Sequence, residues 1–428
     1  TTAKFDRSQP PTPGKAESLK LPPMQKTTLS NGLKVVLAER HAAPVVNLSM
    51  MVDAGFASDS QALPGLASLT MNMLDEGTTN RSAAKISEEF ESLGAEFSAS
   101  TNLDGAFVQL NALKATMPKA LDVYADVLLH PAFAQHELDR LKKDQLAAIQ
   151  REKANPSTMA LRVIPGLVYG KGHAYGLPQS GSGTEAAVAR IGRDDLVKYH
   201  QSWFKPNNAT LLVVGDTTLA EITPLLEKAF GGWKAGETPK KTIAQVAPAD
   251  KPVVYLMDKP GALQSVIYGV QLAPPRNSPD AVQLGVVNNI FGGNFGSRIN
   301  MNLREDKHWS YGVRSSLPSA VGQRLYLSTS PVQSDKTKEA LQELVREYGD
   351  IAGAKPITAA ELADAKNNET LSLPGSFETV GQLAGAYSAV LQYKLPENYY
   401  DTFTGTVLAM TPEQANALAA RTIAPGKL

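Results

Sequence analysis

Strand-like and helix-like hydrophobic patterns follow one another along the chain in an order that occurs twice. In the first half, residues 26–29, 33–37 and 45–52 are short apolar runs typical of strands, and Asn31-Gly32 between the first two is a strong hairpin signal. The remaining predictions for this half are helices over 64–74, 82–93, 118–129, 136–153, 156–169, 194–204 and 219–230, and strands over 96–101, 105–110 and 209–214.

The second half repeats this order of strands, helix, strands and helices. Strands are predicted over 253–257, 265–272 and 324–330, and helices over 278–291, 335–351, 358–371, 377–391, 396–408 and 412–420. A weak repeat supports the duplication, because residues 193–207 resemble residues 412–427. A strand follows the first copy at once, at 210–214, whereas the given sequence stops at Leu428.

The duplicated order predicts an α+β protein of two homologous domains, each a mostly antiparallel sheet with helices packed mainly on one face. The predicted parts are an extended N-terminal arm (1–24), a first domain (25–235), a linker (236–252) rich in Gly, Pro and Lys, and a second domain (253–428). A length of 428 residues agrees with more than one hydrophobic core.

Composition excludes several classes of protein. Lys plus Arg and Asp plus Glu both total 42, so the net charge gives no reason to expect a nucleic acid or an anionic membrane surface as partner. No apolar run approaches the roughly 20 residues of a membrane span. The absence of cysteine excludes disulfides, thiol nucleophiles and thiolate metal sites. The polar start at Thr1 fits a mature exported protein, periplasmic after signal removal, or alternatively a shortened chain.

A glycine-rich stretch in the second half carries the first candidate chemistry. Residues 291–298 read Phe-Gly-Gly-Asn-Phe-Gly-Ser-Arg, and an amphipathic helix and a strand follow. Arg304 and Tyr311 stand seven residues apart across that junction. A guanidinium donates planar, permanently charged hydrogen bonds to a carbonyl or carboxylate, and a tyrosine hydroxyl is a neutral donor that suits a developing oxyanion. In the alternative reading, Arg304 is a cation at a helix C-terminus and Tyr311 an ordinary strand residue.

The predicted helix around residues 65–78 has the pattern of a metal-binding helix but lacks the residues that would bind the metal. Gly65 to Thr78 resembles the metal-binding helix of the pitrilysin, insulin-degrading enzyme and mitochondrial processing peptidase family, whose members carry His-x-x-Glu-His there. In this chain the three motif positions fall on Ser68, Met71 and Asn72. The later glutamate of the family, which is the third zinc ligand, falls near Ala147 or Ala148.

These residues cannot supply the three His or carboxylate ligands that catalytic zinc takes when no cysteine exists. The histidines agree, because no two of the following are four residues apart: His41, His130, His136, His173, His200 and His308. We therefore expect no metal in this chain and no hydrolytic activity of the chain alone.

The resemblance extends from about residue 25 over nearly the whole chain, and the second half matches the family's Arg and Tyr segment. It implies a non-catalytic subunit of a heterodimeric zinc metallopeptidase, in which Arg304 and Tyr311 reach the zinc site of a homologous partner and an unfolded peptide is the substrate. The same fold also occurs in the family as a core subunit of larger assemblies. An inactive peptide-binding or scaffold protein is therefore the alternative.

Overall fold

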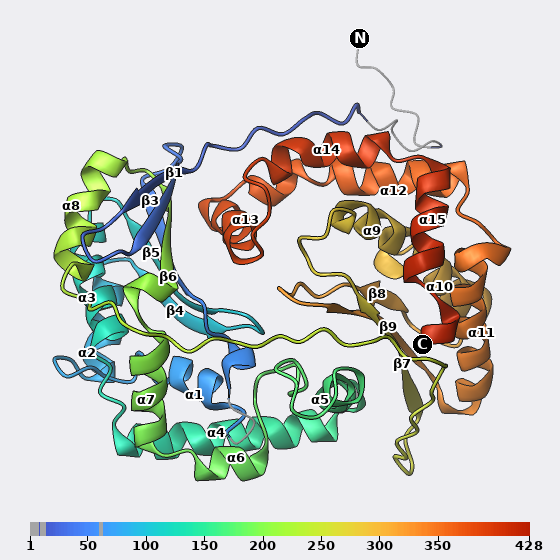
Figure 1. Cartoon of the computed structure of the whole chain (residues 1–428), viewed down its shortest axis with the longest axis horizontal. Coiled ribbons are helices and arrows are strands. Elements are labelled where there is room, and N and C mark those ends of the chain that lie inside the picture. The colour runs from blue at the N-terminus through green and yellow to red at the C-terminus, as the bar shows by residue number, and fades with distance from the viewer. Residues whose placement is uncertain (1–7, 9–13, 60–62) are drawn as a thin grey trace.

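A computed structural model of the chain describes residues 8, 14–59 and 63–428. The first half builds a six-stranded sheet in the order β1-β2-β6-β3-β5-β4 (Figure 1). Only β2 and β6 run parallel, so the sheet is mostly antiparallel, as predicted. The strands are β1 (Gln25–Thr28), β2 (Lys34–Glu39), β3 (Val45–Val52), β4 (Glu96–Thr101), β5 (Ala106–Leu113) and β6 (Ala209–Gly215).

The second half builds a smaller antiparallel sheet in the order β7-β9-β8. Its strands are β7 (Gln264–Ala273), β8 (Arg314–Ser316) and β9 (Arg324–Gln333). The strand predicted over Val253–Met257 is wrong: the segment belongs to no sheet, and Leu256 is 88% exposed, although the backbone N–H of Val253 donates to the carbonyl of Leu428 at 3.1 Å. In the first half, β2 pairs with β6. In the described residues of the second half, no such strand pair forms at 253–257, and the first strand of its sheet is β7.

Helices surround both sheets, and their order matches the prediction apart from α6, which the glycine-rich composition near residue 183 obscured. In the first half they are α1 (Leu66–Asn72), α2 (Ala83–Ser92), α3 (Met117–Leu129), α4 (Gln135–Ala154), α5 (Pro156–Val168), α6 (Glu185–Arg190), α7 (Arg193–Trp203) and α8 (Leu219–Phe230). In the second half they are α9 (Ala281–Asn288), α10 (Arg298–Asn300), α11 (Thr337–Gly349), α12 (Ala359–Leu371), α13 (Val380–Gln392), α14 (Tyr399–Ala409) and α15 (Pro412–Thr422).

One helix of each half packs on the sheet of the other half. Helix α13 packs on β3 and β6 of the first sheet, and α5 packs on β7 of the second, so both helices lie between the sheets (Figure 1). Along β6, Leu211 and Val213 face the helices of their own half, whereas Leu212 and Val214 face α13. The first sheet is therefore covered on both faces, which explains why β6 is apolar at consecutive positions.

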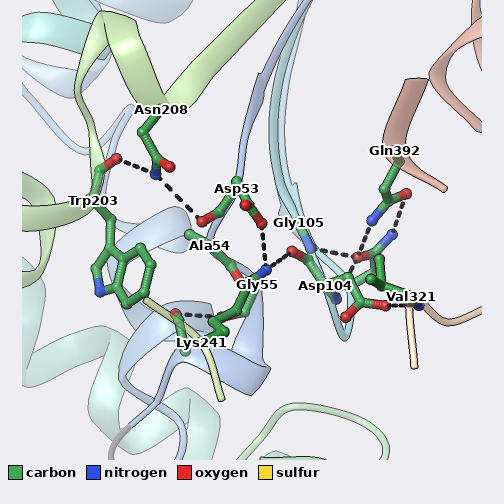
Figure 2. Close-up of polar contacts among 12 residues, drawn as sticks. Asp53, Ala54, Gly55, Asp104, Gly105, Trp203, Asn208, Lys241, Val321 and Gln392 are labelled. Atoms are coloured by element: carbon green, nitrogen blue, oxygen red, sulfur yellow. Dashed lines mark hydrogen bonds and ion pairs between the residues drawn. The ribbon is translucent and has the colours of Figure 1, made fainter. Parts of the chain in front are cut away.

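Polar contacts fix the joint between the halves at the turn joining β4 and β5. Figure 2 shows that Asp104 in this turn accepts a hydrogen bond from the backbone N–H of Val321 at 2.8 Å. Lys241, from the predicted linker, pairs with Asp53 at 2.6 Å and donates to the carbonyl of Ala54 at 2.9 Å (Figure 2). Asp104 is only 2% exposed, and burial raises the pKa of its carboxyl group. The linker is therefore bound to the first half at this point.

The predicted N-terminal arm falls partly outside the described residues, which omit 1–7 and 9–13. Residues 14–24 contain no helix or strand. Leu19 and Leu21 pack against the cluster around α13, and the hydroxyl of Tyr387 donates to the carbonyl of Pro22. The described part of the arm therefore connects the first sheet to the second half. Of the helices within the described ranges, none has the length and apolar character needed to cross a bilayer.

Candidate functional site

Arg304 and Tyr311 both lie on the surface of the second half. A short π-helical segment, Met301–Asp306, continues α10 and carries Arg304, whose side chain is 35% exposed. Tyr311 follows in the irregular segment before β8 and is 89% exposed. The guanidinium of Arg304 lies over the ring of Phe295, with its central carbon 4.5 Å from the ring centroid. Neither side chain is buried within its own domain.

A buried asparagine connects the two segments that carry this pair. Asn300 is fully buried, and its side-chain amide donates to the carbonyl of Phe295 at 2.7 Å. Its side-chain oxygen accepts from the backbone N–H of Val313 at 3.0 Å. One side chain therefore holds the glycine-rich loop, which bears Phe295, against the segment that bears Tyr311. Nothing in the sequence pattern singled out Asn300, because its role depends on contacts across thirteen residues.

The glycine-rich stretch permits a close approach of β8. A π-helical turn, Asn289–Gly293, extends α9, and a Cβ atom on Gly292 would lie 2.4 Å from the hydroxyl of Ser315 and 2.6 Å from its backbone nitrogen. Any larger residue would push β8 away. The stretch therefore serves backbone packing next to the Arg/Tyr segment, as expected for a glycine in a crowded position.

The two arginines of the motif have different surroundings. Arg298 forms a bidentate pair with Glu361, at 2.7 Å from Nε and 2.8 Å from Nη2, and it also donates to the carbonyls of Lys355 and Pro356. Among the described residues, Arg304 contacts the ring of Phe295 and makes one ion pair, at 3.5 Å with its neighbour Glu305. Arg298 therefore holds α10 against α12, whereas the guanidinium of Arg304 has donors left for a ligand.

The degenerate motif positions lie on α1, in three different environments. Met71 is 1% exposed and belongs to the first hydrophobic core. Ser68 is half-buried, and its hydroxyl donates to the carbonyl of Gly181 at 2.8 Å. Asn72 is exposed. Where the family places ligands and a base, this helix therefore presents a core residue, a hydroxyl bonded to a loop, and a solvated amide.

The loop that contains Gly181 covers the start of α1. Gly181 has φ +71°, and a Cβ atom there would lie 2.6 Å from the ring of Phe56 and 2.9 Å from the hydroxyl of Ser68. On α4, Gln145 is buried and donates to the carbonyls of Gly65 and Ser182, at 3.2 and 2.8 Å. The space above α1 is thus filled by the chain's own loop. Sequence reasoning missed this role of Gln145, although a polar residue among apolar helix positions was a visible signal.

A metal site is not formed by the described parts of the chain: no group of three or more His, Asp or Glu residues there has a geometry that could hold an ion. Ala147 is exposed and Ala148 half-buried on α4, and neither side chain has a donor atom. Asp59 is the nearest buried acid to α1, and its carboxylate accepts from the backbone N–H groups of Gly65 and Ala67 at 2.6 and 2.7 Å. Burial raises the pKa of Asp59 to about 7, and these hydrogen bonds oppose the rise.

Comparison with known proteins agrees with this geometry. Residues 34–173 match the family model described as insulinase (peptidase family M16), and residues 190–369 match that of the peptidase M16 inactive domain. The chain is 25% identical over 366 residues to the "uncharacterized zinc protease YmxG" of Bacillus subtilis, covering 83% of this chain and 85% of that protein. It is 22% identical over 388 residues to the "non-peptidase homolog YmxG" of Helicobacter pylori, covering 89% and 87%.

A solved structure confirms the fold. The crystal structure of a peptidase M16 inactive domain from Pseudomonas fluorescens superposes with a TM-score of 0.87 at 25% identity, covering 94% of this chain and 96% of that one. The chain belongs to the M16 family of peptidases. Its two homologous α+β domains and the inactive-type match of its second half agree with a catalytically inactive M16 subunit.

Proposed function

We propose that this chain is the non-catalytic subunit of a heterodimeric zinc endopeptidase and acts on unfolded peptides with a homologous, zinc-bearing partner. The observation that carries the proposal is a contrast between two surfaces. Arg304 is partly exposed and Tyr311 is exposed on the second half, whereas the start of the helix that would bind zinc is covered by the loop around Gly181. A surface with hydrogen-bond donors but no nucleophile of its own needs a reacting centre supplied by another chain.

In this proposal the partner's zinc supplies a polarised water molecule, and this chain supplies charge stabilisation. The guanidinium of Arg304 donates to a substrate carbonyl and holds the peptide in register. The hydroxyl of Tyr311 donates to the oxygen that becomes negative as the scissile carbonyl turns tetrahedral. A donor aimed at such an oxygen typically contributes on the order of 10²–10³ in turnover. Exposure of Tyr311 in the single chain fits a role at a surface that a partner encloses.

The test is co-expression with zinc-bearing M16 homologues, above all any encoded next to this chain, followed by size-exclusion chromatography and cleavage of a flexible peptide. The proposal expects a stable mixed complex that cleaves the peptide, with neither chain active alone. Export to the periplasm is part of the proposal and is checked by fractionation of the native host. Metal-dependent cleavage by this chain alone would overturn the proposal.

A second candidate function is that of an inactive scaffold or peptide-binding homologue. The non-peptidase name of the Helicobacter pylori relative favours it, since that protein matches almost the whole chain. Stable self-association, without any zinc-bearing chain that binds it, would support this function over the first.

A further inference from the structure

A cavity of about 290 Å³ lies where the two halves of the chain meet, next to the joint seen in Figure 2. It is bounded by the turn between β4 and β5, the end of α5 with the loop after it, and residues 318–325 of the second half. Its size is near the lower end of the roughly 300–1,000 Å³ typical of ligand pockets. The larger apolar side chains on its wall are Phe56, Leu103, Pro165, Tyr169, Leu177 and Leu325.

One wall of this cavity carries a buried cation that forms no ion pair with the described residues. Arg324, the first residue of β9, is 3% exposed. Its Nε donates to the carbonyl of Pro274 at 2.7 Å, but its Nη2 is buried and has no hydrogen-bond partner among the residues that the structure describes. In the described ranges of the chain, no carboxylate lies within ion-pair distance of it. Removing an unpaired charge from water is costly, and a bound anion would offset that cost.

A second positive charge adds to this field. Arg276 lies near enough to Arg324 that burial and its charge together lower the pKa of the Arg324 guanidinium to about 10. Arg276 itself donates to the hydroxyl of Tyr399 at 2.8 Å. Two acids lie in this neighbourhood. Asp280 partly opposes the lowering of the Arg324 pKa and is paired with Arg421, and Asp104 accepts a hydrogen bond from the hydroxyl of Tyr175 at 2.6 Å. Arg324 therefore stays the charged donor on the cavity wall, with a second cation beside it.

An acceptor on the same cavity complements the cation. The side-chain oxygen of Gln179 is buried and has no hydrogen-bond partner in the described part of the chain, and Gln179 lines the cavity together with Arg324. A ligand that satisfies both groups needs an anionic oxygen and an N–H donor. The remaining wall is mostly apolar, so such a ligand also needs an apolar group.

We propose that this cavity binds the C-terminal residue of a peptide. Its carboxylate lies on the guanidinium of Arg324, and its amide N–H donates to the oxygen of Gln179. Its apolar side chain contacts Phe56 and Leu103. When a peptidase cleaves a peptide bond, the N-terminal fragment gains a new C-terminal residue. That residue carries a free carboxylate and an amide N–H in this arrangement. Every residue of this site belongs to this chain, so binding needs no partner subunit and fails or succeeds independently of the proposed heterodimer.

The test is calorimetric titration of the full chain with N-acetyl-L-leucine and, as the matched neutral ligand, N-acetyl-L-leucinamide. The expected Kd of the acid is on the order of 1 mM, ordinary for a ligand of this size, and the amide binds at least tenfold more weakly. 4-Methylpentanoate, which keeps the carboxylate but lacks the N–H, is also expected to bind more weakly than the acetylated acid. If the wild-type chain binds the acid and the amide equally, or does not bind the acid, the proposal is overturned.

Variants locate the site. Arg324→Gln is expected to reduce binding of the acid to the level of the amide, and Arg324→Lys to retain part of this binding. In Gln179→Leu, N-acetyl-L-leucine is expected to bind no more tightly than 4-methylpentanoate. Arg151→Gln is the matched control, because it replaces an exposed arginine on α4 that does not line the cavity, and it should change the Kd less than threefold. Circular dichroism checks that each variant is folded. Undiminished binding of the acid by folded Arg324→Gln would contradict the assignment.

Discussion

The guanidinium of Arg304 stacks on the ring of Phe295, 4.5 Å from its centroid, although both side chains are partly exposed. An aromatic face under a guanidinium attracts it and restricts its motion while leaving its N–H groups free to donate. Phe295 therefore positions Arg304 at the surface, in the orientation that Asn300 fixes by binding the carbonyl of Phe295.

Phe295→Leu is expected to reduce the activity of the mixed complex by about two- to fivefold, mostly through KM, because an exposed cation–π contact contributes about 0.5–1 kcal/mol. Phe295→Tyr keeps the aromatic face and should retain activity. Steady-state kinetics on a peptide substrate measure both. An unchanged KM in folded Phe295→Leu would show that the ring does not position Arg304 for binding.

The two arginines of the motif should differ in stability measurements. Arg298→Ala removes a bidentate pair with Glu361 that is mostly buried, and it should lower the free energy of unfolding by about 1–3 kcal/mol. Arg304→Ala should stay within about 0.5 kcal/mol of wild type, as is usual for an exposed side chain. Urea denaturation of the single chain is the measurement. A large loss of stability in Arg304→Ala would mean that this residue is structural.

Restoring the family's motif should not restore a metal site. Met71 is 1% exposed, so Met71→Glu within the triple variant Ser68→His, Met71→Glu, Asn72→His buries a carboxylate in the core and should destabilise the chain by several kcal/mol. Asn72→His alone, at an exposed position, is the control and should be tolerated. Thermal unfolding with and without zinc distinguishes these variants. A triple variant as stable as wild type that binds zinc tightly would show that α1 is not closed to metal.

His200 on α7 should make stability fall in acid. Its ring stacks on Phe204 at 4.6 Å and its Nε2 donates to the carbonyl of Leu128, and burial lowers its pKa to about 4. Because the unfolded state keeps a pKa near 6.5, only that state takes up a proton between these values. The contribution is therefore complete above pH 6.5 and is lost toward pH 4, up to about 3 kcal/mol.

The measurement is urea denaturation at several pH values. His200→Gln should remove this part of the pH dependence, so the difference in unfolding free energy between wild type and variant changes between pH 6.5 and pH 4. His136→Gln replaces an exposed histidine on α4 and is the matched control. A constant difference between wild type and His200→Gln across this range would contradict the assignment to His200.

The sequence predicted those helices and strands whose hydrophobic residues pack within their own half of the chain. The apolar run of β3 and the helical spacing of α1 could be recognised in the sequence for this reason. The strand expected at Val253–Met257 failed because a strand needs a neighbour, and hydrophobic pattern alone does not report one. The apolar run of β6 predicted a strand, but not that α13 of the other half covers it.

The candidate site was predictable only in part, for a similar reason. Arg304 and Tyr311 stand in a recognisable spacing, so they could be named from the sequence. Phe295, Asn300 and Gly181 act through contacts that connect separate segments, and spacing does not reveal such contacts. The cavity beside Arg324 needed both halves of the chain in place before it could be seen.

The most direct test of the proposed role is the turnover number of the mixed complex in which this chain carries Arg304→Ala and Tyr311→Phe together. Arg151→Ala with Tyr255→Phe, which changes an arginine and a tyrosine at exposed positions elsewhere, is the matched control. The account predicts that the first variant assembles normally and loses on the order of 10²–10³ in turnover, while the control retains it. Wild-type turnover in the first variant would contradict the account.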